Sequence, residues 1–125
     1  MSTILEGRGI LIVEDQPLIA MDVSEALESA GAVVMTSRTL SHALLAVERE
    51  GISGAIIDHG LPDGNSEPLC KRLGERGIPF LIYSGYKEDG GGGPWGRAPH
   101  VDKPATDVQI VNAMVELIFQ KHTAR

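Results

Sequence analysis

Five chemically capable side chains stand at or directly after short apolar runs in this sequence. They are three carboxylates, a hydroxyl and an ammonium group: Glu14, Asp15, Asp58, Ser84 and Lys103. Three carboxylates held close together repel one another, so such a site either raises a pKa or recruits a cation. Mg²⁺ suits the role because it prefers oxygen ligands and usually takes only one or two carboxylates, which leaves room for a phosphoryl oxygen. The residue types therefore indicate an acidic Mg²⁺ site.

Asp58 is the candidate nucleophile. A carboxylate held beside a cation can attack phosphorus and form an aspartyl phosphate. Lys103, Ser84 and the backbone amide of Gly85 could then stabilise charge on the phosphoryl oxygens. Each residue taken alone also has an ordinary structural explanation: Lys103 as a surface lysine, Ser84 as a capping hydroxyl and the carboxylates as solvated acids at strand ends. Only their convergence favours a chemical role.

The elements that must position these groups alternate between short aliphatic runs and stretches of helical period. Strands are expected at residues 9–13, 32–36, 54–58 and 80–84, and around 100–102. This alternation is typical of βαβ units around a parallel sheet, so the predicted fold class is α/β with a doubly wound, five-stranded sheet. In such a sheet a ligand lies beyond the carboxyl ends of the strands, which is where all the candidate residues stand. We expect residues 1–125 to form one domain.

Capping residues predict where several helices begin and end. Pro17 suits the first turn of a helix that Gly31 can close with a left-handed cap. Ser66 can cap a later helix, and Thr106 and Gln109 are spaced as a capping box at the start of the last one.

A glycine-rich stretch breaks the pattern before the fifth strand. Residues 87–99 contain Gly90, Gly91, Gly92, Gly93, Pro94 and Gly96. The backbone entropy of this composition opposes a stable helix, so a mobile loop is expected there in place of a full fourth helix.

Charge and cysteine content restrict the environment and the partners. Eleven Lys and Arg against seventeen Asp and Glu give a net charge of −6, which argues against nucleic acid as a partner. Cys70 is the only cysteine, so no internal disulfide forms and a reducing compartment is expected. No apolar stretch reaches membrane-spanning length, and we expect a cytoplasmic protein without a membrane partner.

Four short motifs resemble those of the receiver domain of two-component response regulators. They are Ile-Val-Glu-Asp at 12–15, Asp-His-Gly-Leu-Pro-Asp-Gly at 58–64, Tyr-Ser-Gly-Tyr at 83–86 and Asp-Lys-Pro at 102–104. The likeness spans residues 9–118, and four motifs in order are specific where one alone is weak. The resemblance implies the flavodoxin-like strand order 2-1-3-4-5 and a phosphorylation switch, not an enzyme beyond slow self-catalysed phosphotransfer and dephosphorylation.

The resemblance also assigns roles to the site residues. Asp58 is implied to be the phosphoacceptor, Ser84 the switch hydroxyl and Lys103 the family's lysine. The implied Mg²⁺ ligands are Glu14, Asp15, Asp58 and the Gly60 carbonyl. A sensor histidine kinase or a phosphotransfer protein would supply the phosphoryl group. With no effector domain expected after the last helix, output would pass through protein contacts.

The sequence departs from the common family pattern in the glycine-rich stretch and at His100, where the family often carries a Tyr or Phe. Together with Pro79-Phe80 and Ser84-Gly85-Tyr86, these features resemble stand-alone receivers with a Phe-Ala-Thr-Gly-Tyr-like motif, which pair with HWE-type histidine kinases. In that subgroup Tyr86 would take over part of the switch role. Independently of the subgroup, we expect residues 87–99 to reorder on phosphorylation.

Two other functions compete with this interpretation. An adaptor that keeps the receiver fold and acts without phosphorylation would need none of the site residues. A flavodoxin-like cofactor protein would need a phosphate-cradling loop after the first strand, where Glu14 and Asp15 would repel the phosphate.

The last helix carries a wide apolar arc, which fits either a homodimer or partner surface or a deeply packed helix. Trp95 fits either a partner anchor or an aromatic that folds back over the sheet.

Overall fold

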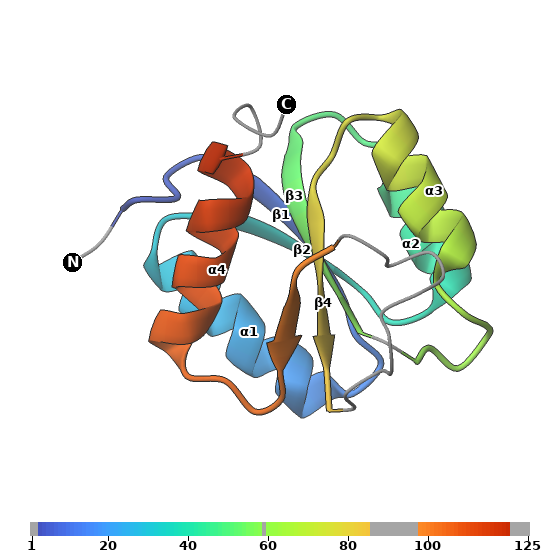
Figure 1. Ribbon diagram of the computed structural model, residues 1–125, viewed down its shortest axis with the longest axis horizontal. Helices are drawn as coiled ribbons and strands as arrows, with labels where there is room; N and C mark the ends of the chain where they lie inside the picture. Colours follow the sequence, from blue (N-terminus) through green and yellow to red (C-terminus); the bar gives the residue numbers. More distant parts are fainter. Residues whose placement is uncertain (1–2, 59, 86–97, 121–125) are drawn as a thin grey trace.

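The computed structural model describes residues 3–58, 60–85 and 98–120, which form an open sheet of five parallel strands flanked by helices (Figure 1). The strands are β1 (Gly9–Val13), β2 (Val33–Ser37), β3 (Ile52–Asp58), β4 (Phe80–Ser84) and β5 (His100–Asp102). Their order is β2-β1-β3-β4-β5, and every neighbouring pair is parallel. The predicted fold class and strand order are confirmed. Only the strand bounds shift, by one residue in β2 and by two at the start of β3.

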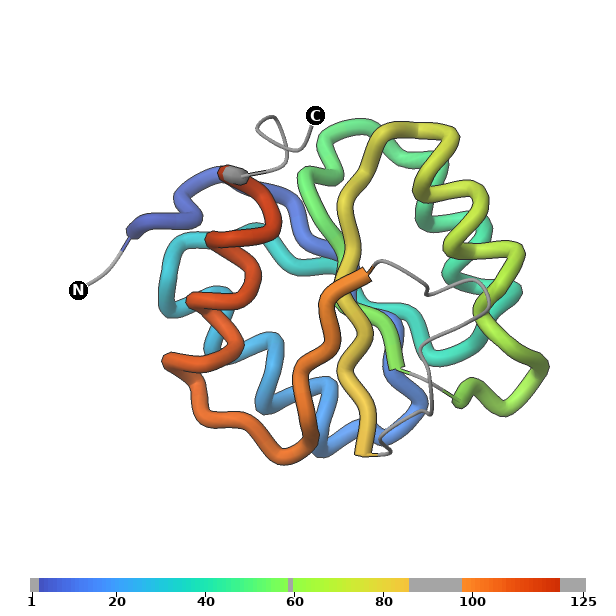
Figure 2. Tube along the Cα trace, viewed as in Figure 1, coloured from blue at the N-terminus to red at the C-terminus, as the bar shows by residue number. Residues whose placement is uncertain are grey.

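The described helices cover the two faces of the sheet in pairs. They are α1 (Pro17–Ser29), α2 (Leu40–Ala46), α3 (Glu67–Glu75) and α4 (Asp107–Gln120). Helices α1 and α4 lie on one face, and α2 and α3 lie on the other (Figures 1 and 2). Most of the loop predicted at residues 87–99 in place of a further helix, with Trp95, falls within residues 86–97, which lie outside the described part of the chain. Among the described helices, none is both long and apolar enough to cross a bilayer.

The interior strand β1, which lies between β2 and β3, is buried along its whole length, as its continuous apolar run predicts. Because side chains alternate along a strand, Ile10 and Ile12 enter the apolar layer beneath α1 and α4, whereas Leu11 and Val13 enter the layer beneath α2 and α3. Gly54 on β3 lets α4 approach closely, since a Cβ there would lie 3.0 Å from the Met114 side chain. The sheet is therefore held from both sides, and its carboxyl edge is fixed in place.

The capping predictions are mostly confirmed. Pro17 is the first residue of α1, and Gly31 follows the helix with a φ of +99°. The capping box is present, because the Thr106 amide donates to Gln109 Oε1 at 2.9 Å and the Gln109 amide donates to Thr106 Oγ1 at 3.1 Å.

Ser66 stands at the N-cap of α3, but its side chain does not cap the helix. With φ −89° and ψ 11° its backbone lies outside the extended region that a capping side chain requires. The hydroxyl is fully buried and hydrogen-bonds the Cys70 side chain instead. Asn65 Oδ1 accepts the hydrogen bond from the Glu67 amide at 2.9 Å. The prediction of a Ser66 cap was therefore wrong.

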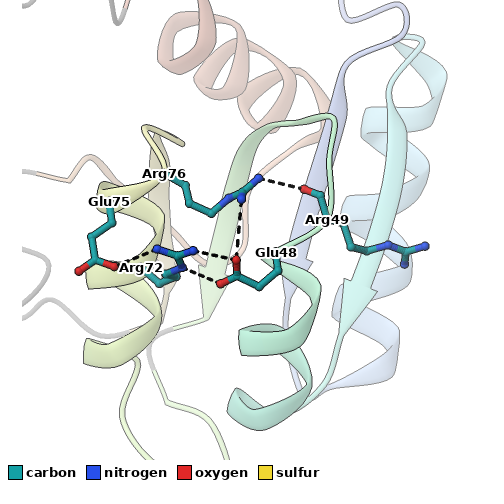
Figure 3. Close-up of polar contacts among 5 residues, drawn as sticks. All are labelled: Glu48, Arg49, Arg72, Glu75 and Arg76. Atoms are coloured by element: carbon teal, nitrogen blue, oxygen red, sulfur yellow. Dashed lines mark hydrogen bonds and ion pairs between the residues drawn. The ribbon is translucent and has the colours of Figure 1, made fainter.

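An ion-pair cluster joins the turn after α2 to α3 (Figure 3). The Arg72 guanidinium donates to both carboxylate oxygens of Glu48, at 2.6 and 2.8 Å, and to Glu75 at 3.2 Å. Arg76 donates to the Arg49 carbonyl at 3.3 Å and lies 3.8 Å from Glu48. These side chains are partly exposed, so each pair contributes at most about 1 kcal/mol. The cluster fixes the α2–α3 layer and lies apart from the chemistry at the strand ends.

Candidate functional site

The carboxyl ends of β1, β3, β4 and β5 meet around one cavity of about 390 Å³. Six residues named from the sequence line it: Asp15, Asp58, Gly60, Ser84, Gly85 and Lys103. Glu14 lies behind them and is only 2% exposed. The structure thus brings together all seven residues named from the sequence. It also adds Gln16 and Ile19 to the wall, both from the start of the helical segment after β1.

The three carboxylates form a compact cluster. One oxygen each of Glu14, Asp15 and Asp58 lies within 4.8 Å of the other two. The cause is the parallel register of β1 and β3, in which Val13 lies opposite Ile57. The next residues, Glu14 after β1 and Asp58 at the end of β3, therefore emerge side by side. Glu14 and Asp58 are buried, whereas Asp15 is half-buried at the cavity wall. The cluster therefore faces an opening that a small ligand can enter.

Lys103 bridges two of these acids. Its Nζ lies 3.0 Å from Glu14 Oε1 and donates to Asp58 Oδ1 at 2.9 Å. Its backbone amide donates to the Ser84 carbonyl at 3.0 Å, which continues the β4–β5 ladder beyond the last strand residue. The side chain is 17% exposed, so its ammonium acts in surroundings much less polar than water.

Burial and charge shift the ionisation of the site. Burial raises the pKa of Asp58, against the hydrogen bond and charge of Lys103, and neighbouring Asp15 raises it further. Burial likewise raises the pKa of Glu14, which Lys103 again opposes. Burial alone would lower the pKa of Lys103, but its hydrogen bonds to Asp58 and Glu14 outweigh this effect and leave that pKa raised. One ammonium thus offsets part of the repulsion among three acids.

The donor set fits a hard divalent cation. Every acidic ligand atom in the cluster is a carboxylate oxygen, and Gly60, whose backbone carries a further oxygen, lines the same cavity. Mg²⁺ favours this all-oxygen chemistry and commonly keeps several waters, which the open cavity allows. The residues present therefore fit the predicted Mg²⁺ site.

Ser84 and Gly85 form the part of the wall that comes from β4. Ser84 is 1% exposed, and a Cβ added at Gly85 would meet no described atom within 4 Å. The space at the Gly85 Cα is therefore open in the described part of the chain. The role of the Gly85 amide as a donor to a phosphoryl oxygen stays a prediction. His100 is exposed on β5, and Tyr86 lies outside the described residues. The switch roles considered for His100 and Tyr86 stay predictions.

The sequence did not reveal a set of hydrogen bonds beside the site, made by Asp63. Asp63 Oδ1 accepts from the Leu40 amide at 2.7 Å, and Oδ2 accepts from the Ser41 amide at 3.0 Å and the Ser41 hydroxyl at 2.8 Å. The loop that follows Asp58 is thereby fastened to the start of α2. Only the Pro-Asp-Gly turn hinted at a special role for Asp63, and a turn does not reveal a partner more than twenty residues away in sequence.

Tyr83, one residue before Ser84, was also missed as a functional side chain. Its hydroxyl accepts a hydrogen bond from the Ala105 amide at 3.1 Å, and its ring lies beneath the Lys103 ammonium. The available signal was a tyrosine, with its polar hydroxyl, directly after the apolar residues Phe80, Leu81 and Ile82.

Together, the doubly wound sheet and its acidic edge define a class: an α/β domain with a carboxylate cluster and a lysine at the carboxyl ends of its strands. No family model matches the chain. Its curated relatives include the KDP operon transcriptional regulatory protein KdpE of Escherichia coli, which is 32% identical over 81 residues, 64% of this chain and 36% of KdpE. The sensor protein TorS of the same organism is 29% identical over 83 residues, 66% of this chain and 9% of TorS. The chain thus spans only a minor part of either relative.

Solved structures are similar over nearly the whole chain. A CheY-like response regulator receiver domain from Methanospirillum hungatei has a TM-score of 0.83 at 22% identity, covering 94% of this chain and 98% of its own, which shows the shared fold. One from Methylobacillus flagellatus has a TM-score of 0.76 at 27% identity, with coverages of 88% and 98%. SdrG from Sphingomonas melonis is 36% identical, with a TM-score of 0.73 and coverages of 88% and 95%. The chain belongs to the response regulator receiver (CheY-like) domain family.

Proposed function

We propose that Asp58 is the phosphoacceptor of this receiver domain and that its phosphorylation depends on Mg²⁺. The observation that carries the proposal is the position of the Asp58 carboxylate, which lies at the end of β3 in an open cavity between Lys103 and a second acid, Asp15. A carboxylate oxygen of Asp58 would attack the phosphorus of a phosphohistidine. The new P–O bond forms as the P–N bond breaks, and the imidazole nitrogen leaves with the electron pair.

The residues around Asp58 would each act on the incoming group. Lys103 can turn its ammonium from Asp58 Oδ1 to a phosphoryl oxygen while its contact with Glu14 at 3.0 Å holds it at the site. The Ser84 hydroxyl and the Gly85 amide supply neutral donors from the neighbouring strand. Transfer then shifts the population toward the state in which Ser84 and Lys103 close on the phosphoryl group.

The Mg²⁺ ligands in this proposal are Asp15, Asp58, Glu14 and the Gly60 carbonyl. When bound, the ion would offset the negative charge that gathers between the carboxylates and the phosphoryl oxygens. Asp15 is best placed to hold it at the opening, because it is the most exposed of the three acids and lines the cavity. Glu14 lies deeper and contributes chiefly by anchoring Lys103.

The partners follow from the same proposal. A sensor histidine kinase or a phosphotransfer protein supplies the phosphoryl group, and the motif Ser84-Gly85-Tyr86 favours a kinase of the HWE type. Output passes to another protein, not to nucleic acid, and involves reordering of residues 87–99. The domain acts in the cytoplasm as a switch rather than as an enzyme.

A homodimer through the last helix is a further part of the proposal. Val108 is 67% exposed on α4, whereas Leu117 packs partly buried against the core beneath α1 and α4. Much of the wide apolar arc is therefore used within the fold. Val108 is the side chain through which self-association is best tested.

Acetyl phosphate labelling tests the proposed function. Wild-type protein should gain one hydroxylamine-sensitive phosphate with Mg²⁺ and none with EDTA, because an acyl phosphate reacts with hydroxylamine. Folded protein that stays unlabelled under both conditions would instead favour the phosphorylation-independent adaptor.

A further inference from the structure

Tyr83 occupies a central place in the sheet beside the reacting groups. On β4 it is in register with Asp58 of β3 on one side and with Val101 of β5 on the other. The side chain is 6% exposed and enters the apolar layer beneath α1 and α4, whereas that of Ile82 enters the opposite layer. Tyr83 therefore reaches the segment that joins β5 to α4.

The Tyr83 hydroxyl fixes this connecting segment. It accepts the hydrogen bond of the Ala105 amide at 3.1 Å, two residues after Lys103. On the other side, the Lys103 amide donates to the Ser84 carbonyl at 3.0 Å. The backbone that carries Lys103 is therefore tied to β4 at Lys103 itself and again just after it, by two consecutive residues of the same strand.

The Tyr83 ring acts on the lysine side chain itself. Lys103 Nζ lies 5.5 Å from the ring centroid, within the range of about 6 Å in which an ammonium is attracted to an aromatic face. The same Nζ contacts Glu14 at 3.0 Å and Asp58 at 2.9 Å. A lysine has a flexible stem of four carbons, so a fixed ammonium position requires restraints of this kind.

We infer that Tyr83 is the positioning residue of Lys103, holding its ammonium where an incoming phosphoryl oxygen arrives. The inference rests on the proposed function, since it explains how one residue of that site is kept in place. If Tyr83 only filled the core, a phenylalanine would serve equally well. A purely core role does not require a hydroxyl at this position or its hydrogen bond with the Ala105 amide.

Tyr83→Phe tests the inference because it keeps the ring and removes the acceptor. The control is Thr39→Ala, which removes the N-cap of α2, where Thr39 Oγ1 accepts from the His42 amide at 3.1 Å. Both variants lose one hydrogen bond, so a similar loss of stability is expected. With acetyl phosphate and Mg²⁺, the rate constant of Tyr83→Phe at saturating donor should fall about fivefold, with the half-saturating donor concentration unchanged. Thr39→Ala should react at the wild-type rate.

A second measurement needs no phosphorylation. In wild type, the ring beneath Lys103 should shift the proton resonances of its ε-methylene upfield of those of exposed Lys71. In Tyr83→Phe these resonances should move toward the Lys71 values, and the Ala105 amide should exchange faster.

Unchanged Lys103 resonances in Tyr83→Phe would overturn the inference. A wild-type rate in Tyr83→Phe, or an equal loss of rate in Thr39→Ala, would do the same. If wild-type protein takes up no phosphate, the proposed function fails, and the Lys103 resonances alone decide the positioning role.

Discussion

Replacing Lys103, which lines the cavity, by methionine should strongly destabilise the metal-free protein. Lys103 is the cation that contacts both buried acids, Glu14 at 3.0 Å and Asp58 at 2.9 Å. At an effective dielectric constant of about 20, each such pair is worth about 5 kcal/mol of attraction. The loss of this attraction in Lys103→Met is mostly offset, because the variant no longer has to remove an ammonium from water. The net loss in the free energy of unfolding at pH 7 should be about 2–4 kcal/mol, since two buried acids lose their counter-ion.

The pH dependence of this loss has a definite sign. The pKa values of Glu14 and Asp58 are raised by burial in the folded protein, and removing Lys103 takes away the effect that opposes the rise. A raised folded-state pKa means that protonation stabilises the native state. That stability is present at low pH and lost as the pH rises through the folded-state pKa. The penalty in Lys103→Met should therefore be largest at neutral pH and shrink as the pH falls.

Urea unfolding of wild type, Lys103→Met and Lys71→Met measures the effect. Lys71 is exposed on α3, so its variant makes the same chemical change away from the acids. Added Mg²⁺ should recover more stability in Lys103→Met than in wild type, because binding to the native state alone stabilises it. A loss no larger than that of Lys71→Met, or a loss that does not change with pH, would refute the electrostatic reasoning.

Three further outcomes are expected. Hydrogen bonds from the Leu40 and Ser41 amides lower the pKa of Asp63, so Asp63→Asn should lower the urea midpoint at neutral pH. The difference from wild type should vanish as the pH falls through the lowered pKa. A difference that is equally large at neutral and at acidic pH would contradict this. Burial raises the pKa of the Cys70 thiol to about 11, so iodoacetamide at pH 8 should modify the protein in urea but not in buffer. Mass spectrometry measures the modification, and rapid labelling of the native protein would contradict the expectation. Val108→Asp should abolish any self-association seen by sedimentation without lowering stability, whereas an unchanged dimer would remove α4 as the interface.

The sheet and the site could be predicted from the sequence because both depend on strand ends. A run such as residues 10–13 is apolar on both faces only if it is buried on both, so an interior place in a parallel sheet followed directly. Residues that terminate parallel strands share one edge, which brought Glu14, Asp58 and Lys103 together without knowledge of any contact.

Contacts across the fold could not be predicted in this way. From the sequence, Tyr83 is indistinguishable from a core residue, and only the structure shows that its hydroxyl accepts from the Ala105 amide. Asp63 likewise looks like a turn residue, and only the structure shows that it accepts from the Leu40 amide of α2. Ser66 was placed correctly at the start of α3, but its hydroxyl bonds the Cys70 side chain and not a backbone amide of the first turn. In each case the decisive neighbour is chosen by tertiary structure rather than by local pattern.

The assignment of the phosphoacceptor is tested most directly by intact mass. Wild type, Asp58→Ala and Asp22→Ala, whose acid is exposed on α1, should be incubated with acetyl phosphate and Mg²⁺ after folding is verified by circular dichroism. One phosphate adduct is expected on wild type and on Asp22→Ala, with none on Asp58→Ala. An adduct that persists on Asp58→Ala, or no adduct on any of the three folded proteins, would contradict the account.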